Sequence, residues 1–170
     1  LLLMAAFTSI PAVMTEHVGL PPEQHAWLYL ATLCGALPGV AILVRRRQEL
    51  DDPRPLLALS VLLTVLGLVT GLWASSLLVL GMGLILFFMG FTALETILPA
   101  LVSIVAPTSL RGTAMGIFSS AQFLGVFTGG ALGGNALHVG GAVGLVAVLS
   151  MLTGIWLAGL WRFGRAPMAV

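Results

Sequence analysis

Residues 77–105 read LLVLGMGLILFFMGFTALETILPALVSIV, a stretch with a single charged residue, Glu95. A straight helix of this length reaches about 43 Å, whereas the hydrocarbon core of a bilayer is about 30 Å thick. The stretch is therefore long enough to span a membrane, and the helix must tilt, bend or project from it. Pro99 is the expected site of a bend.

The whole chain has the composition of a membrane protein. Of its 170 residues, 59% are hydrophobic and 8% are charged, whereas a soluble domain averages about 25% charged residues. A chain this poor in charge lacks the polar surface that a soluble globule needs, so the lipid bilayer is its expected solvent and partner. The net charge of +1 gives no indication of nucleic acid binding.

Polar residues divide the sequence into one partial and five full apolar spans. The partial span covers residues 1–14, and the chain is expected to begin partway along that helix. The full spans are expected near residues 26–44, 56–73, 77–105, 113–134 and 142–161. Helices are expected throughout, because open strand edges leave backbone groups without hydrogen bonds in lipid. The predicted fold class is an all-α integral membrane bundle whose first helix is truncated.

The arginines fall in alternate connections between these spans, and the other connections carry none. They are Arg45, Arg46, Arg47 and Arg54 in one predicted loop, Arg111 in another, and Arg162 and Arg165 in the tail. The positive-inside rule places connections of this kind in the cytoplasm. The arginine pattern therefore predicts that these loops and the C-terminus are cytoplasmic.

Glu95 is the first candidate for a functional residue. It lies about 15 Å from the inner end of its predicted helix, and Phe88, Phe91 and Thr92 share its helical face. No basic residue lies in a predicted span, so Glu95 is expected to be protonated or to face a water-filled cavity. A role in handling a proton or a substrate and a purely structural hydrogen bond to a neighbouring helix both fit these observations.

The next span contributes a second polar side chain, Gln122, with Ser119 on the same helical face. An amide in a membrane helix joins neighbouring helices about as often as it contacts a ligand. Both interpretations of Gln122 stay open.

Glycines recur at four-residue spacing in this same span. Gly125, Gly129 and Gly133 form one stripe, and Gly130 and Gly134 form a second. Small residues at this spacing allow helix backbones to approach closely. The double stripe predicts a tight helix contact that slides or bends. A shorter version, Gly67 and Gly71, occurs in an earlier span.

No motif of metal binding or catalysis accompanies these residues. The sequence has no HExxH, no GxSxG, and no group of His, Cys and acidic residues with the spacing of metal ligands. We therefore expect no metal, no cofactor and no enzymatic activity.

The run APTSLRGTAMGIFSSAQFLGVFTGGALGG at residues 106–134, preceded by FTALETILPALVS, resembles helices 11 and 10 of the major facilitator superfamily. Its signature RGTAMG…QFLG…GG…GG is similar to that of bacterial drug-efflux members. The resemblance implies a bacterial inner membrane transporter of two six-helix halves that works by alternating access. This chain would be the C-terminal half, with the N-terminal half as its partner. The implied activity is proton-coupled efflux, or antiport, of small amphipathic molecules.

The chain departs from the family pattern in two places. The hinge-like glycine motif often has Gly-Pro where this chain has Gly129-Gly130. The loop between helices 8 and 9 often carries an Asp-containing, Gly-Arg-rich gating motif, which RRRQELDDPRP at residues 45–55 lacks. The alternative function is a non-transporting scaffold or assembly subunit, although a scaffold has no reason to bury Glu95.

Overall fold

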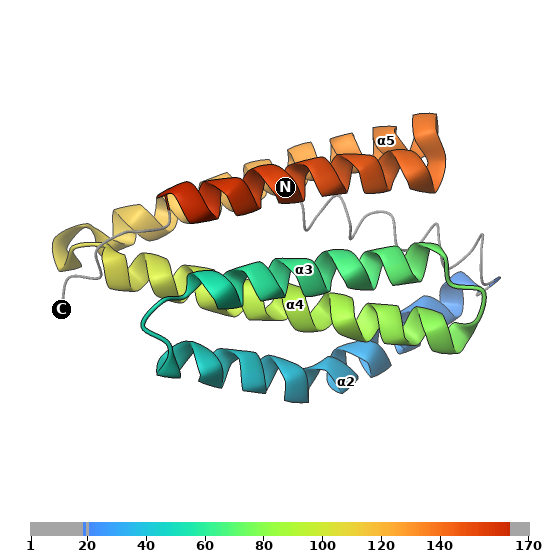
Figure 1. Cartoon of the computed structure of the whole chain (residues 1–170), viewed down its shortest axis with the longest axis horizontal. Coiled ribbons are helices and arrows are strands. Elements are labelled where there is room, and N and C mark those ends of the chain that lie inside the picture. Colours follow the sequence, from blue (N-terminus) through green and yellow to red (C-terminus); the bar gives the residue numbers. More distant parts are fainter. Residues whose placement is uncertain (1–18, 20, 164–170) are drawn as a thin grey trace.

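A computed structural model shows the chain as a bundle of long helices (Figure 1). It describes residue 19 and residues 21–163, so the partial span expected over residues 1–14 lies outside the described part. The helices α2 (Pro22–Glu49), α3 (Arg54–Leu72) and α4 (Leu77–Val105) are followed by a short 3-10 helix, η1 (Thr108–Leu110), and by α5 (Arg111–Phe163). Residues 21–163 contain no strand. The predicted all-α fold class is confirmed.

All four α-helices of the described part are long and apolar enough to cross a membrane. At the start of α4 the Ser76 hydroxyl accepts a hydrogen bond from the backbone of Val79, and an extended Ala106 follows its end. The helix continues through Pro99.

The arginines predicted in loops stand instead at helix ends. Arg45, Arg46 and Arg47 belong to the end of α2, while Arg54 and Arg111 begin α3 and α5. Arginine is a good helix former, and its positive charge is favourable in the last turn of a helix. The connection between α2 and α3 is therefore only residues 50–53 long.

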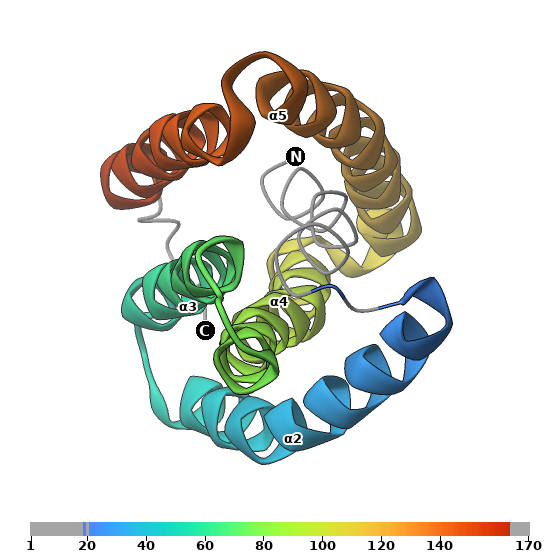
Figure 2. The same cartoon turned by 90° about the vertical axis from the view of Figure 1, so that its right-hand side faces the viewer.

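α5 folds back on itself at Gly141. This glycine has φ 58° and ψ −154°, a backbone conformation that L side chains rarely adopt, and it separates two helical limbs, 111–140 and 142–163. The two limbs meet at this turn and diverge from it, the first toward α4 and the second toward α3 (Figure 2). Each limb is roughly 30 Å long or more, enough for a separate crossing. The limbs contain the two spans expected over 113–134 and 142–161.

α3 and α4 form the centre of the bundle, with α2 on one side and α5 on the other (Figure 2). Their backbones touch at glycines. A Cβ atom added to Gly83 would lie 2.8 Å from the carbonyl oxygen of Gly67 and 2.9 Å from the backbone nitrogen of Gly71. A Cβ added to Gly90 would lie 2.8 Å from the backbone nitrogen of Thr64. Only glycine allows this approach at Gly67, Gly83 and Gly90, whereas a Cβ added to Gly71 would meet only the Leu80 side chain, at 3.7 Å.

The apolar core consists of two clusters along this central pair. One surrounds the fully buried Phe87, and the other surrounds the fully buried Ala93. Trp156 and Leu160 of the second α5 limb pack against the Ala93 cluster. These contacts hold the second limb beside α3 and α4 at the level of Glu95.

Candidate functional site

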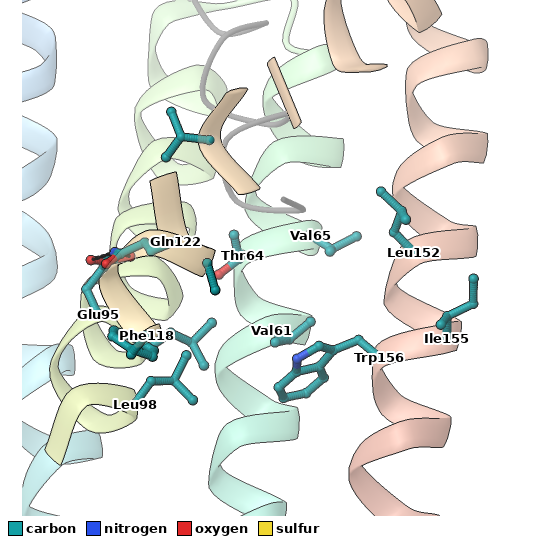
Figure 3. Close-up of a pocket in the computed structure, with 13 residues that line it drawn as sticks. Val61, Thr64, Val65, Glu95, Leu98, Phe118, Gln122, Leu152, Ile155 and Trp156 are labelled. Atoms are coloured by element: carbon teal, nitrogen blue, oxygen red, sulfur yellow. Dashed lines mark hydrogen bonds between the residues drawn. The ribbon is translucent and has the colours of Figure 1, made fainter. Parts of the chain in front are cut away.

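A cavity of about 430 Å³ lies between α3, α4 and both limbs of α5 (Figure 3). Three of its lining residues are polar, namely Thr64, Glu95 and Gln122. The other lining side chains are aliphatic or aromatic, among them Phe118 and Trp156. Small-molecule sites commonly have volumes of about 300–1,000 Å³, an apolar lining and a few polar groups. The cavity has the size and composition of such a site.

Glu95 and Gln122 meet in the wall of this cavity. The Nε2 atom of Gln122 donates to both carboxylate oxygens of Glu95, at 2.9 Å to Oε1 and 2.7 Å to Oε2. Figure 3 shows the two side chains pointing toward one another from α4 and the first limb of α5. Both residues are half-buried. The two polar groups that the sequence analysis singled out are therefore direct partners.

The amide of Gln122 takes the place that a cation would take in an ion pair. No Arg, Lys or His is among the described residues that line the cavity. A carboxylate removed from water is costly unless it receives hydrogen bonds, and a hydrogen bond to a charged group contributes about 1.5–3 kcal/mol. Gln122 lowers the cost of placing the acid here and leaves it accessible from the cavity.

Thr64 and Trp156 complete the polar and aromatic part of the lining, and the sequence analysis did not identify either. The Thr64 hydroxyl donates to the backbone carbonyl of Ser60 at 2.9 Å, so its oxygen can still accept a hydrogen bond. Figure 3 shows the indole of Trp156 reaching from the second limb toward Val61 of α3. The four-residue spacing of Ser60 and Thr64 was the signal in the sequence for a polar face on α3.

Four residues predicted for the substrate or proton pathway do not line this cavity: Phe88, Phe91, Thr92 and Ser119. Phe88 is buried and packs edge-on against Tyr29 of α2, with ring centroids 6.0 Å apart. Phe91 stacks on Phe87 with centroids 5.7 Å apart. The helical wheel of α4 grouped Phe88, Phe91 and Thr92 with Glu95, but α2 packs against α4 at the level of Phe88.

The glycine stripes of α5 differ in their burial. Gly125, Gly129 and Gly133 are buried, as a packing surface requires. Gly130 is half-buried, and Gly134 is exposed, with no atom within 4 Å of a Cβ added there. The first stripe faces into the bundle. The second stripe is only partly buried, because Gly134 is exposed.

The chain is similar in sequence to two known bacterial transporters. The inner membrane transport protein YajR of Escherichia coli is 34% identical over 161 residues, which cover 92% of this chain and 35% of that protein. The chain is homologous to a bacterial inner membrane transport protein. An uncharacterized transporter of Buchnera aphidicola is 49% identical over 53 residues, which cover 31% of this chain and 14% of that protein. This chain therefore spans about a third of the length of YajR.

No family model matches the chain, and no solved structure gives a significant match.

Proposed function

We propose that this chain is the C-terminal half of a major facilitator superfamily transporter in the bacterial inner membrane. Its transport cycle is alternating access between this half and an N-terminal six-helix half. The observation that carries the proposal is the Glu95–Gln122 pair in the wall of an apolar cavity. The homology to YajR over 92% of the chain supports it.

The cavity favours neutral or cationic amphipathic substrates. Its aliphatic and aromatic side chains can bury the apolar part of a small molecule, and Glu95, Gln122 and Thr64 offer hydrogen-bond acceptors. An anionic substrate would meet the Glu95 carboxylate with no basic group among the described lining residues to compensate. The substrate class is therefore small amphipathic molecules, as in the drug-efflux branch.

The proposed coupling is to protons. A carboxyl group at a membrane cavity can bind a proton when the cavity opens to one side and release it when the cavity opens to the other. Glu95 would bind a proton and a cationic substrate alternately. Because the two cannot bind at once, each would cross the membrane in the opposite direction, which is antiport. A scaffold subunit has no use for a carboxylate at a cavity of this size.

The test uses the full-length protein, reconstituted in proteoliposomes with an imposed pH gradient and a panel of amphipathic compounds. Wild-type protein is expected to export at least one compound in a manner that depends on the gradient. Glu95→Gln retains the size of the side chain and removes the titrating group, so gradient-driven export should be lost while the protein still folds. Thr96→Val is the matched control, because Thr96 is exposed and bonds only its own helix at Thr92.

Two results would overturn the proposal. One is a wild-type protein that moves none of the compounds under any gradient. The other is a Glu95→Gln protein whose export has an unchanged rate and pH dependence, which leaves the carboxyl with a structural role.

A further inference from the structure

We infer that Gln122 is the positioning residue of Glu95, and that it holds the carboxyl group at one place in the cavity wall in both protonation states. The inference deepens the proposed function and rests on it for the transport measurement alone.

Glu95 and Gln122 are in direct contact through their side chains. One amide nitrogen, Nε2 of Gln122, lies within hydrogen-bond distance of both oxygens of Glu95, at 2.9 Å and 2.7 Å. Between described residues of different helices, no other hydrogen bond joins two side chains. The pair is therefore the polar link between α4 and the first limb of α5.

The chemistry of an amide explains why Gln suits this position. The amide offers an N–H donor to a carboxylate and a C=O acceptor to a carboxylic acid O–H. The terminal torsion of Gln is broad and roughly two-fold, so a half-turn exchanges the two groups without movement of a helix. An Arg or Lys has donors only, and it would lose its hydrogen bond when the carboxyl group takes up a proton.

Among the described lining residues, Gln122 is the one that hydrogen-bonds the carboxyl group of Glu95. The described lining residues from α3, α4 and α5 include no titratable group besides Glu95. Thr64, the remaining polar lining residue, gives its hydroxyl proton to the carbonyl of Ser60, so it cannot donate to an ionised Glu95, and among the described residues no hydrogen bond joins it to Glu95. When Glu95 is protonated, the Gln122 carbonyl is the acceptor within reach, and when Glu95 is ionised, the Gln122 amino group is the donor. The carboxyl group thus keeps its place throughout a cycle of proton uptake and release.

The test is infrared difference spectroscopy of the full-length protein in bilayers, between acid and alkaline pH. Glu95→Gln identifies the C=O band of protonated Glu95 by its loss. In Gln122→Met, which keeps the length of the side chain and removes both amide groups, that band should move to higher wavenumber because the acid has lost its hydrogen-bond partner. Gradient-driven export should fall roughly tenfold or more in the same variant, as expected for loss of a hydrogen bond to a charged group.

Thr128→Val is the matched control. Thr128 lies on the same limb and donates only to backbone carbonyls of its own helix, so both the band and export should stay at their wild-type values. A band at the wild-type position in a folded Gln122→Met protein overturns the inference, whatever its export.

If Gln122→Met does not fold, Gln122→Asn replaces it in the same measurement. Its amide is one methylene short of Glu95, so the band should again rise, and an unmoved band again overturns the inference. If the wild-type protein exports nothing, the proposed function fails, while the band still decides whether Gln122 holds Glu95.

Discussion

The guanidinium of Arg54 lies over the ring of Trp161, with its central carbon 5.3 Å from the ring centroid. Asp52 holds the same guanidinium from the side, with Nε 2.9 Å from Oδ1 and Nη2 2.7 Å from Oδ2. The Arg54 side chain is only 16% exposed. These contacts join the start of α3 to the end of the second α5 limb.

We expect Arg54 and Trp161 to stabilise the protein as a pair. Arg54→Gln and Trp161→Leu should each lower the midpoint of thermal unfolding in detergent, because each removes the contact between a cation and an aromatic face. The double variant should lower it by less than the sum of the two single effects. Arg46→Gln is the control, since its contact to Glu49 is exposed and should contribute little. Fully additive effects would show that the two side chains do not interact.

We expect glycine to be required where α3 and α4 touch. Gly83→Ala should destabilise the protein by about 1–3 kcal/mol, because the new Cβ overlaps the backbone of Gly67 and Gly71. Gly81→Ala, two residues away, meets no atom within 4 Å and should leave stability unchanged or slightly raised. Thermal unfolding of both variants under the same conditions measures the difference. Equal stabilities would contradict the close approach of the two backbones.

We expect a larger side chain in the cavity to block export. Ala121 lines the cavity, and Ala121→Trp would fill part of its roughly 430 Å³. Export by the full-length protein should fall sharply while the elution profile of the purified protein stays unchanged. Ala131→Trp places the same side chain at an exposed position of the same limb and should export normally. Normal export by Ala121→Trp would mean that substrate takes another route.

We expect the two ends of the bundle to lie on opposite sides of the membrane. The connection between α2 and α3 lies at one end, and the turn at Gly141 lies at the other (Figure 1). In a Cys34→Ser background, a membrane-impermeant thiol reagent added outside the cell should modify His138→Cys and leave Leu50→Cys unmodified. The reverse pattern would invert the proposed topology, in which the arginine-bearing ends are cytoplasmic.

Sequence patterns can indicate apolar helices because membrane spans depend on local composition. Residues 77–105 are bounded by a capping serine and a proline-containing turn, and both signals are visible in the sequence. The predicted loop around residues 45–55 was too long because a run of arginines looks like a loop by polarity, although arginine forms helix readily.

The sequence identified Glu95 and Gln122 separately, as polar groups in apolar spans, and did not predict that they touch. That contact depends on how α5 returns past α4 after η1, which no local pattern encodes. Phe88 shares a helical face with Glu95, but the wheel of one helix does not show that Tyr29 of α2 packs against Phe88.

The backbones of α3 and α4 are in direct contact at Gly67, Gly83 and Gly90, so we expect the two helices to stay together. The cavity lies on the flank of this pair, and α5 closes its other side. A displacement of α5 that changed the cavity volume would leave every glycine contact of the central pair in place. In such a motion α3 and α4 would keep their position relative to each other, and α5 would move against them.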